Sequence, residues 1–189
     1  AMAPEELKAD GALSESPALT DRKLIKTVSM EAETEHYDDL VAALEEKLTA
    51  LGGYTENRRT GSYSKNRRWS DMTIRIPAEN LSGFVAHVNE SANVVSTSEE
   101  TVDVTLQYSD TEAKIAALET EQTRLLELLA KAENMADLLT VEARLTDVRT
   151  ELEQHKSQLR LYDNQVDYAT IYLYIDEVQE YTPVEEPTF

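Results

Sequence analysis

The chain of 189 residues contains no cysteine, which excludes disulfides, thiolate metal sites and cysteine nucleophiles. Basic residues are scarce: 18 Lys and Arg stand against 37 Asp and Glu, a formal net charge of −19. Because a chain this acidic repels other polyanions, we exclude nucleic acid as a general partner. The sequence also lacks a signal peptide and any apolar run long enough to span a bilayer. Because Ala1 precedes Met2, we expect the native start to be missing, which makes the lack of a targeting segment uninformative.

Motifs of catalysis and cofactor binding are also missing. The chain has no His-Glu-x-x-His motif, no Gly-rich phosphate loop and no Gly-x-Ser-x-Gly elbow. Its histidines, His36, His87 and His155, fall on three different predicted elements. The acids around His36 lie at a predicted helix start, where the helix dipole favours them without any metal. We therefore expect a protein that is not an enzyme, with no cofactor and no metal site.

The strongest pattern is a pair of heptad repeats within residues 109–162. A spacing that alternates between three and four residues predicts a helix with a seam, and a seam needs a facing helix. Residues 133–137 between the repeats are too few for anything but an antiparallel turn. The predicted seam consists of Ile115, Leu118, Gln122, Leu125 and Leu129, followed by Leu138, Val141, Leu145, Val148, Leu152, His155 and Leu159. The expected contacts are Leu129 with Val141, Leu125 with Leu145, Leu118 with Leu152, and Ile115 with the register-setting His155.

The other elements are predicted from apolar periodicity and turn residues. Strands are expected at residues 22–33, 54–60, 69–76, 93–107 and 167–176, with a bulge near residues 98–100. Helices are expected at residues 35–51, with Thr34 as N-cap, and at residues 78–91. The order β-α-β-β-α-β, then the hairpin, then β predicts an α+β fold. We expect a ferredoxin-like split β-α-β sheet with a long antiparallel coiled-coil hairpin inserted before the last strand.

This reading divides the chain into four parts. Residues 1–20 are expected to be a flexible leader, and residues 21–108 with 163–177 the sheet body. Residues 109–162 form the predicted arm. Residues 178–189 are an acidic tail of juxtamembrane type.

Two groups of residues are candidate binding sites. The first is a basic tip between two strands, where cations of an acidic protein gather beside aromatic rings: Arg58, Arg59, Lys65, Arg67 and Arg68, with Tyr63 and Trp69. It would bind an anion or an acidic partner, or else be solvated or paired with acids of its own body. The second is a row of Tyr168, Tyr172 and Tyr174 on the last strand. Such a row either stacks on sugars or packs under neighbouring elements.

Six stretches in this order resemble the bacterial domain-of-unknown-function family 4349. They are RKLIKT at residues 22–27, RIPAE at 75–79, DVTLQYSD at 103–110, LLAKA at 128–132, DLLTVEARL at 137–145 and ATI at 169–171. The resemblance implies an exported protein with a signal or lipoprotein segment and a membrane helix after the last strand, beyond the given sequence. It supplies no catalytic residues.

We expect an extracytoplasmic domain of a membrane-anchored bacterial envelope protein. Its arm would bind a protein partner or a second copy of the chain. The alternative is a sensor ectodomain that binds an envelope ligand and signals across the membrane. A hydrolase that uses scattered carboxylates is the least favoured reading.

Overall fold

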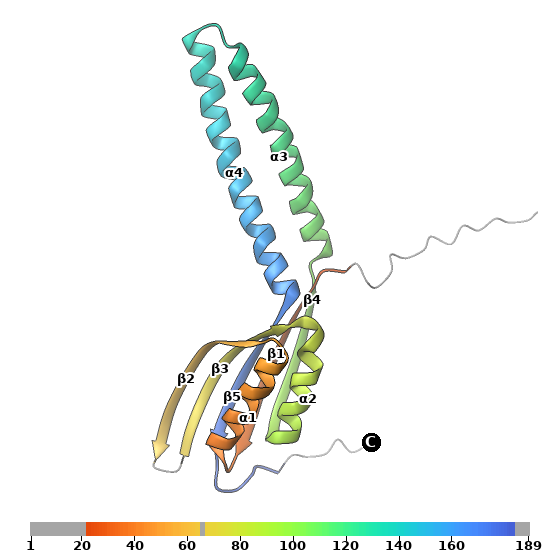
Figure 1. Cartoon of the computed structure of the whole chain (residues 1–189), viewed down its shortest axis with the longest axis vertical. Helices are drawn as coiled ribbons and strands as arrows, with labels where there is room; N and C mark the ends of the chain where they lie inside the picture. The colour runs from red at the N-terminus through yellow and green to blue at the C-terminus, as the bar shows by residue number, and fades with distance from the viewer. Residues whose placement is uncertain (1–21, 65–66, 184–189) are drawn as a thin grey trace, which may run out of the picture.

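The computed structural model describes residues 22–64 and 67–183. A twisted sheet carries two helices on one face, and two long helices project together from one end of the sheet (Figure 1). In chain order the elements are β1 (Leu24–Thr34), α1 (Tyr37–Ala50), β2 (Tyr54–Ser64), β3 (Arg67–Pro77), the 3-10 turn η2 (Ala78–Asn80), α2 (Leu81–Ser91), β4 (Asn93–Asp103), α3 (Thr105–Lys131), α4 (Met135–Asp167) and β5 (Tyr168–Glu177).

The sheet has the strand order β2-β3-β5-β1-β4. Neighbouring strands are antiparallel except for β1 and β5, which are parallel. The last strand of the chain is therefore the central strand of the sheet. The predicted α+β class is confirmed, but the ferredoxin-like arrangement is not, because β5 separates β1 from β3 where the simple split unit would pair them.

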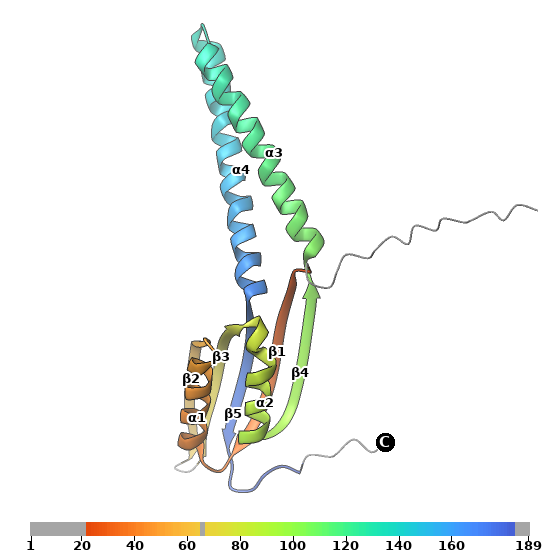
Figure 2. The same cartoon turned by 45° about the vertical axis from the view of Figure 1, so that its right-hand side comes forward.

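The main core lies between the sheet and the two helices α1 and α2. Alternate residues of the inner strands point into it, as the pleat of a β-strand requires. Its fully buried members include Val28, Met30, Met72, Ile74, Ile76, Ile171, Leu173 and Ile175 from the sheet, and Leu44, Phe84 and Val88 from the helices. Both helices cover the same face (Figure 2). The opposite face is not covered by any helix of the described residues.

The long helices α3 and α4 form the arm. At a rise of 1.5 Å per residue, their 27 and 33 residues span about 40 and 50 Å. A single residue, Val104, separates β4 from α3, and α4 continues into β5 without any residue between them. Because β1 lies between β4 and β5, the two helices start apart at the sheet and converge toward the tip (Figure 2).

Several predicted boundaries were wrong. The strand predicted at residues 93–107 ends at Asp103, and the arm is longer than residues 109–162 at both ends. The predicted polar tip at residues 61–68 is mostly strand. In the β1–β4 pair the register shifts at Glu31/Ala32, and not at residues 98–100. The N-cap of α1 is His36, whereas Thr34 is the buried last residue of β1. The predicted leader, residues 1–20, lies outside the described residues.

Candidate functional site

The seam predicted for the arm lies on the facing sides of α3 and α4. All twelve of its side chains are buried or half-buried. Leu118, Val148 and Leu152 form a small buried cluster, against which Ile115 and Leu125 pack. Salt bridges cross between the helices beside it, from Arg144 to Glu121 (2.8 Å) and from Lys156 to Glu119 (2.9 Å). The polar seam residues Gln122 and His155 are both half-buried.

At the tip, a capped turn reverses the chain. The Asp137 N–H donates to Asn134 Oδ1 (2.9 Å), so Asn134 caps α4 as helix N-termini require. Large apolar side chains are exposed on both sides of this turn: Leu128 (54%), Met135 (69%) and Leu139 (58%). We call these three the tip residues. A hollow of about 460 Å³ lies beside them, and its lining includes Leu128, Ala132 and Val141.

The base of the arm is joined to the sheet by a buried cation. Arg75 on β3 is 7% exposed and donates to the Asn164 carbonyl oxygen in the last turn of α4 (3.1 Å), to Asn164 Oδ1 and to Thr170 Oγ1. A cation at a helix C-terminus is favoured by the helix dipole. Across the base, the Tyr108 hydroxyl donates to Asp163 Oδ1 (2.7 Å), and this bond raises the pKa of Tyr108 to about 12. Arg75 therefore ties α4 to the sheet, and the Tyr108–Asp163 bond ties α3 to α4.

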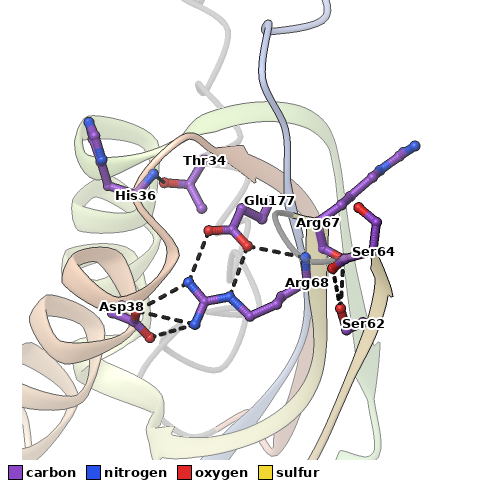
Figure 3. A network of polar contacts seen from close by, with 8 residues as sticks. All are labelled: Thr34, His36, Asp38, Ser62, Ser64, Arg67, Arg68 and Glu177. Carbon is purple, nitrogen blue, oxygen red and sulfur yellow. Dashed lines mark hydrogen bonds and ion pairs between the residues drawn. The ribbon is translucent and has the colours of Figure 1, made fainter.

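The basic tip lies at the end of the sheet away from the arm. Arg68 donates through Nε to Glu177 (2.8 Å) and through both terminal nitrogens to Asp38 (Figure 3). Its guanidinium also lies 4.6 Å from the Tyr37 ring centroid. These bonds raise the pKa of Arg68 and lower the pKa of Glu177 below its usual value. The network joins α1, β3 and β5 across the distal end of the core.

The other predicted cations of this tip divide between the two faces of the sheet. Arg58 forms an ion pair with Glu45 of α1 on the helix side. Arg67 pairs with Asp176 (3.1 Å), and Arg59 lies opposite Asp71 on β3. Lys65 lies outside the described residues. Arg58, Arg67 and Arg68 thus contact acids of their own chain, which is one of the two interpretations that the sequence left open.

Trp69 and its neighbours form an aromatic cluster on the uncovered face of the sheet. The Trp69 and Tyr174 rings are stacked with centroids 6.3 Å apart, and Tyr63 lies 6.4 Å from Trp69. The Tyr63 and Tyr174 hydroxyls are 3.2 Å apart. Burial, together with this contact, raises the pKa of Tyr174 to about 12. Sequence reasoning missed this cluster, because it placed Tyr63 between two strands and Trp69 at the start of the second, and it could not predict that β3 pairs with β5.

The histidines lie far from one another, at the start of α1, on α2 and on α4. In the described residues, no group of three or more His, Asp and Glu side chains is placed to hold a metal ion. Within the same part of the chain, no helix combines the length and hydrophobicity that crossing a bilayer requires.

Comparison with curated proteins and with solved structures gave no match. A family model described as a domain of unknown function, DUF4349, matches residues 22–189, nearly the whole chain. The chain therefore belongs to the DUF4349 family.

Proposed function

We propose that this protein is a non-enzymatic extracytoplasmic module of the bacterial envelope. It binds another protein, or a second copy of itself, through the tip of its arm. The observation that carries the proposal is the exposure of the tip residues Leu128, Met135 and Leu139. Met135 and Leu139 are four residues apart on α4 and so lie on one side of the helix. Large apolar side chains left in water at the end of an arm are typical of an interaction site.

The construction of the arm supports this role. One residue separates β4 from α3, and none separates α4 from β5. Arg75 binds the last turn of α4. The buried cluster of Leu118, Val148 and Leu152 between the helices stiffens the pair, as the seam of the proposed coiled coil would. The arm therefore carries the tip residues about 40 Å from the sheet.

The direction of the arm supports the proposal that the protein is anchored in the membrane. β5 runs away from the arm, so the chain leaves the sheet at the opposite end (Figure 1). The family resemblance implies a membrane helix after this strand. An anchor there would make the arm point away from the membrane, with its tip presented to a partner.

The test compares two sets of substitutions on the arm. In the tip variant Leu128, Met135 and Leu139 are changed to Ser. In the control variant Leu106 and Leu161, which lie near the base of the arm and are 70% and 49% exposed, are changed to Ser. A photo-reactive residue at position 136 reports proximity by cross-linking in isolated envelopes, and sedimentation of the purified domain reports self-association.

We expect the parent and the control variant to form the same cross-linked product or the same dimer, and the tip variant to form neither. All three should have the same far-UV circular dichroism. Equal products from tip and control variants would refute a role for the tip residues. A monomer without cross-links in the parent would refute the proposed function.

A further inference from the structure

The face of the sheet opposite α1 and α2 is a second exposed surface, separate from the arm. β5 is the central strand, yet its Tyr172 is 48% exposed, whereas its neighbours Ile171 and Leu173 on the other face are fully buried. A half-exposed ring at the centre of a five-stranded sheet means that no described residue covers the middle of this face, although Thr182 donates to Glu33 at its distal end. We call it the open face.

Aromatic rings follow the open face from end to end. At the arm end, Tyr54 and Tyr168 meet edge to face with centroids 6.2 Å apart. At the distal end lies the cluster of Tyr63, Trp69 and Tyr174, and Tyr172 stands between the two groups. Side chains two residues apart on a strand share a face, so Tyr168, Tyr172 and Tyr174 belong to one row.

Trp69 lies flat against the neighbouring strand. A Cβ atom added at Gly61, its partner on β2, would come within 2.5 Å of the indole ring. The glycine therefore gives the indole the space that a side chain would take. The half-buried indole of β3 thus lies over the backbone of β2.

The residues between the rings are polar. In register with Tyr172 lie Ser29 on β1 and Thr73 on β3. In register with Tyr174 lie Glu31 and Asp71, whose carboxylates accept hydrogen bonds. An apolar helix or an acyl chain would leave these polar groups without partners, so neither suits this face.

The charge on the open face excludes further classes of ligand. The carboxylates of Glu31, Glu33, Asp71 and Asp176 outnumber the exposed cations Arg59 and Arg67. Anionic polymers and anionic lipid surfaces are repelled by this excess. The remaining ligand chemistry is a neutral molecule that has apolar faces and a rim of hydroxyl groups.

We propose that the open face binds a neutral oligosaccharide chain. The C–H faces of its sugar rings stack on Trp69, Tyr172 and Tyr174, as flat apolar surfaces stack on aromatic rings. Its hydroxyls hydrogen-bond to the serine, threonine and carboxylate groups between the rings. At the distal end, the Arg67 guanidinium lies 5.5 Å from the Tyr63 ring centroid, and a hollow of about 460 Å³ has Glu33, Ser64 and Arg67 in its lining. The sugar chain runs along β5, from the aromatic cluster toward the arm.

Trp69 is the only tryptophan of the chain, so its fluorescence reports on the proposed site without labelling. The whole chain is titrated with β-1,4-linked hexasaccharides of glucose and of N-acetylglucosamine, and with polygalacturonate as an anionic control. We expect at least one neutral hexasaccharide to give a saturable change in emission, and polygalacturonate to give none.

Two tyrosine variants locate the binding. Tyr172→Ala removes a ring from the open face, and Tyr181→Ala removes one of almost equal exposure (47%) that lies after β5, outside the sheet. We expect Tyr172→Ala to bind at least about tenfold more weakly and Tyr181→Ala to bind like the parent. The tip variant of the arm should also bind like the parent, because this proposal does not depend on the arm.

The proposal is overturned if neither hexasaccharide changes the emission at about 10 mM, a concentration that would detect even weak binding. It is equally overturned if Tyr172→Ala and Tyr181→Ala lose affinity alike. Tyrosine-rich surfaces also bind proteins. If Tyr172→Ala abolished cross-linking to an envelope protein while no saccharide changed the emission, the open face would be a protein-binding surface.

Discussion

Truncation of Leu145 tests whether the seam holds the arm together. Leu145 on α4 is 4% exposed, whereas Leu139, six residues earlier on the same helix, is 58% exposed. A buried Leu→Ala change typically costs about 2–5 kcal/mol, according to how far the surroundings collapse. Two helices without a third layer can close part of the space, so we expect about 2–3 kcal/mol for Leu145→Ala. For Leu139→Ala we expect about 0.5 kcal/mol or less, because the side chain is already in water.

Amide hydrogen exchange is the suitable assay, since the arm can open while the sheet stays folded. A loss of about 2–3 kcal/mol accelerates exchange of the α3 and α4 amides by about 30- to 150-fold, at about 1.4 kcal/mol per factor of ten. The amides of β1 and β5 should not change. Leu145→Asp should have a still larger effect, because it buries a charge without a partner. Equal exchange in the Leu145→Ala and Leu139→Ala variants would refute the placement of the seam.

Three further predictions concern the sheet. Arg75→Leu should lower the free energy of unfolding by about 1–3 kcal/mol, because Asn164 in α4 and Thr170 in β5 lose a charged hydrogen-bond donor. Arg75→Lys should restore only part of this loss, as urea titration can show. The bonds to Arg68 lower the pKa of Glu177 in the folded protein below its usual value. As the pH falls, Glu177 is therefore protonated in the unfolded chain before it is protonated in the folded protein, and the free energy of unfolding should drop between about pH 5 and 3. Glu177→Gln should flatten this drop in acid titrations of the melting temperature. Gly61→Ala should displace the Trp69 ring, which would shift the tryptophan emission to the red and cost about 1–3 kcal/mol in urea unfolding.

Local patterns in the sequence were sufficient for some elements. The heptad spacing selected seam positions whose side chains are shielded in the structure, because a helix repeats its faces every few residues whatever the rest of the chain does. The same reasoning failed at the start of α3. Val104 and Leu106 look like alternate residues of a strand, but Leu106 is 70% exposed on the first turn of a helix. The Asp103 side chain accepts bonds from the Thr105 N–H and hydroxyl at this point, a local contact that ends the strand.

Contacts between distant parts of the chain could not be predicted from these patterns. Residues 61–64 and 67–68 include few apolar side chains and have the composition of a turn, yet they belong to β2 and β3 and take part in the pairing of these strands. The bonds of Arg68 to Asp38 and Glu177 span 30 and 109 residues. The place of β5 between β1 and β3 depends on pairing between strands that the whole arm separates in the sequence. No local periodicity encodes such a pairing.

The position of β5 also determines how the arm behaves. α3 follows β4, an edge strand, and α4 precedes β5, the central strand, so β1 holds the two helix bases apart. A swing of the whole arm would bend both strands and break the ladders that β1 forms with them. Arg75 adds bonds from a third strand to the last turn of α4. Because these restraints come from three strands, motion at the base costs several backbone hydrogen bonds at once. The arm is therefore a rigid extension of the sheet, and any flexibility is expected near the tip, where only the two helices hold each other.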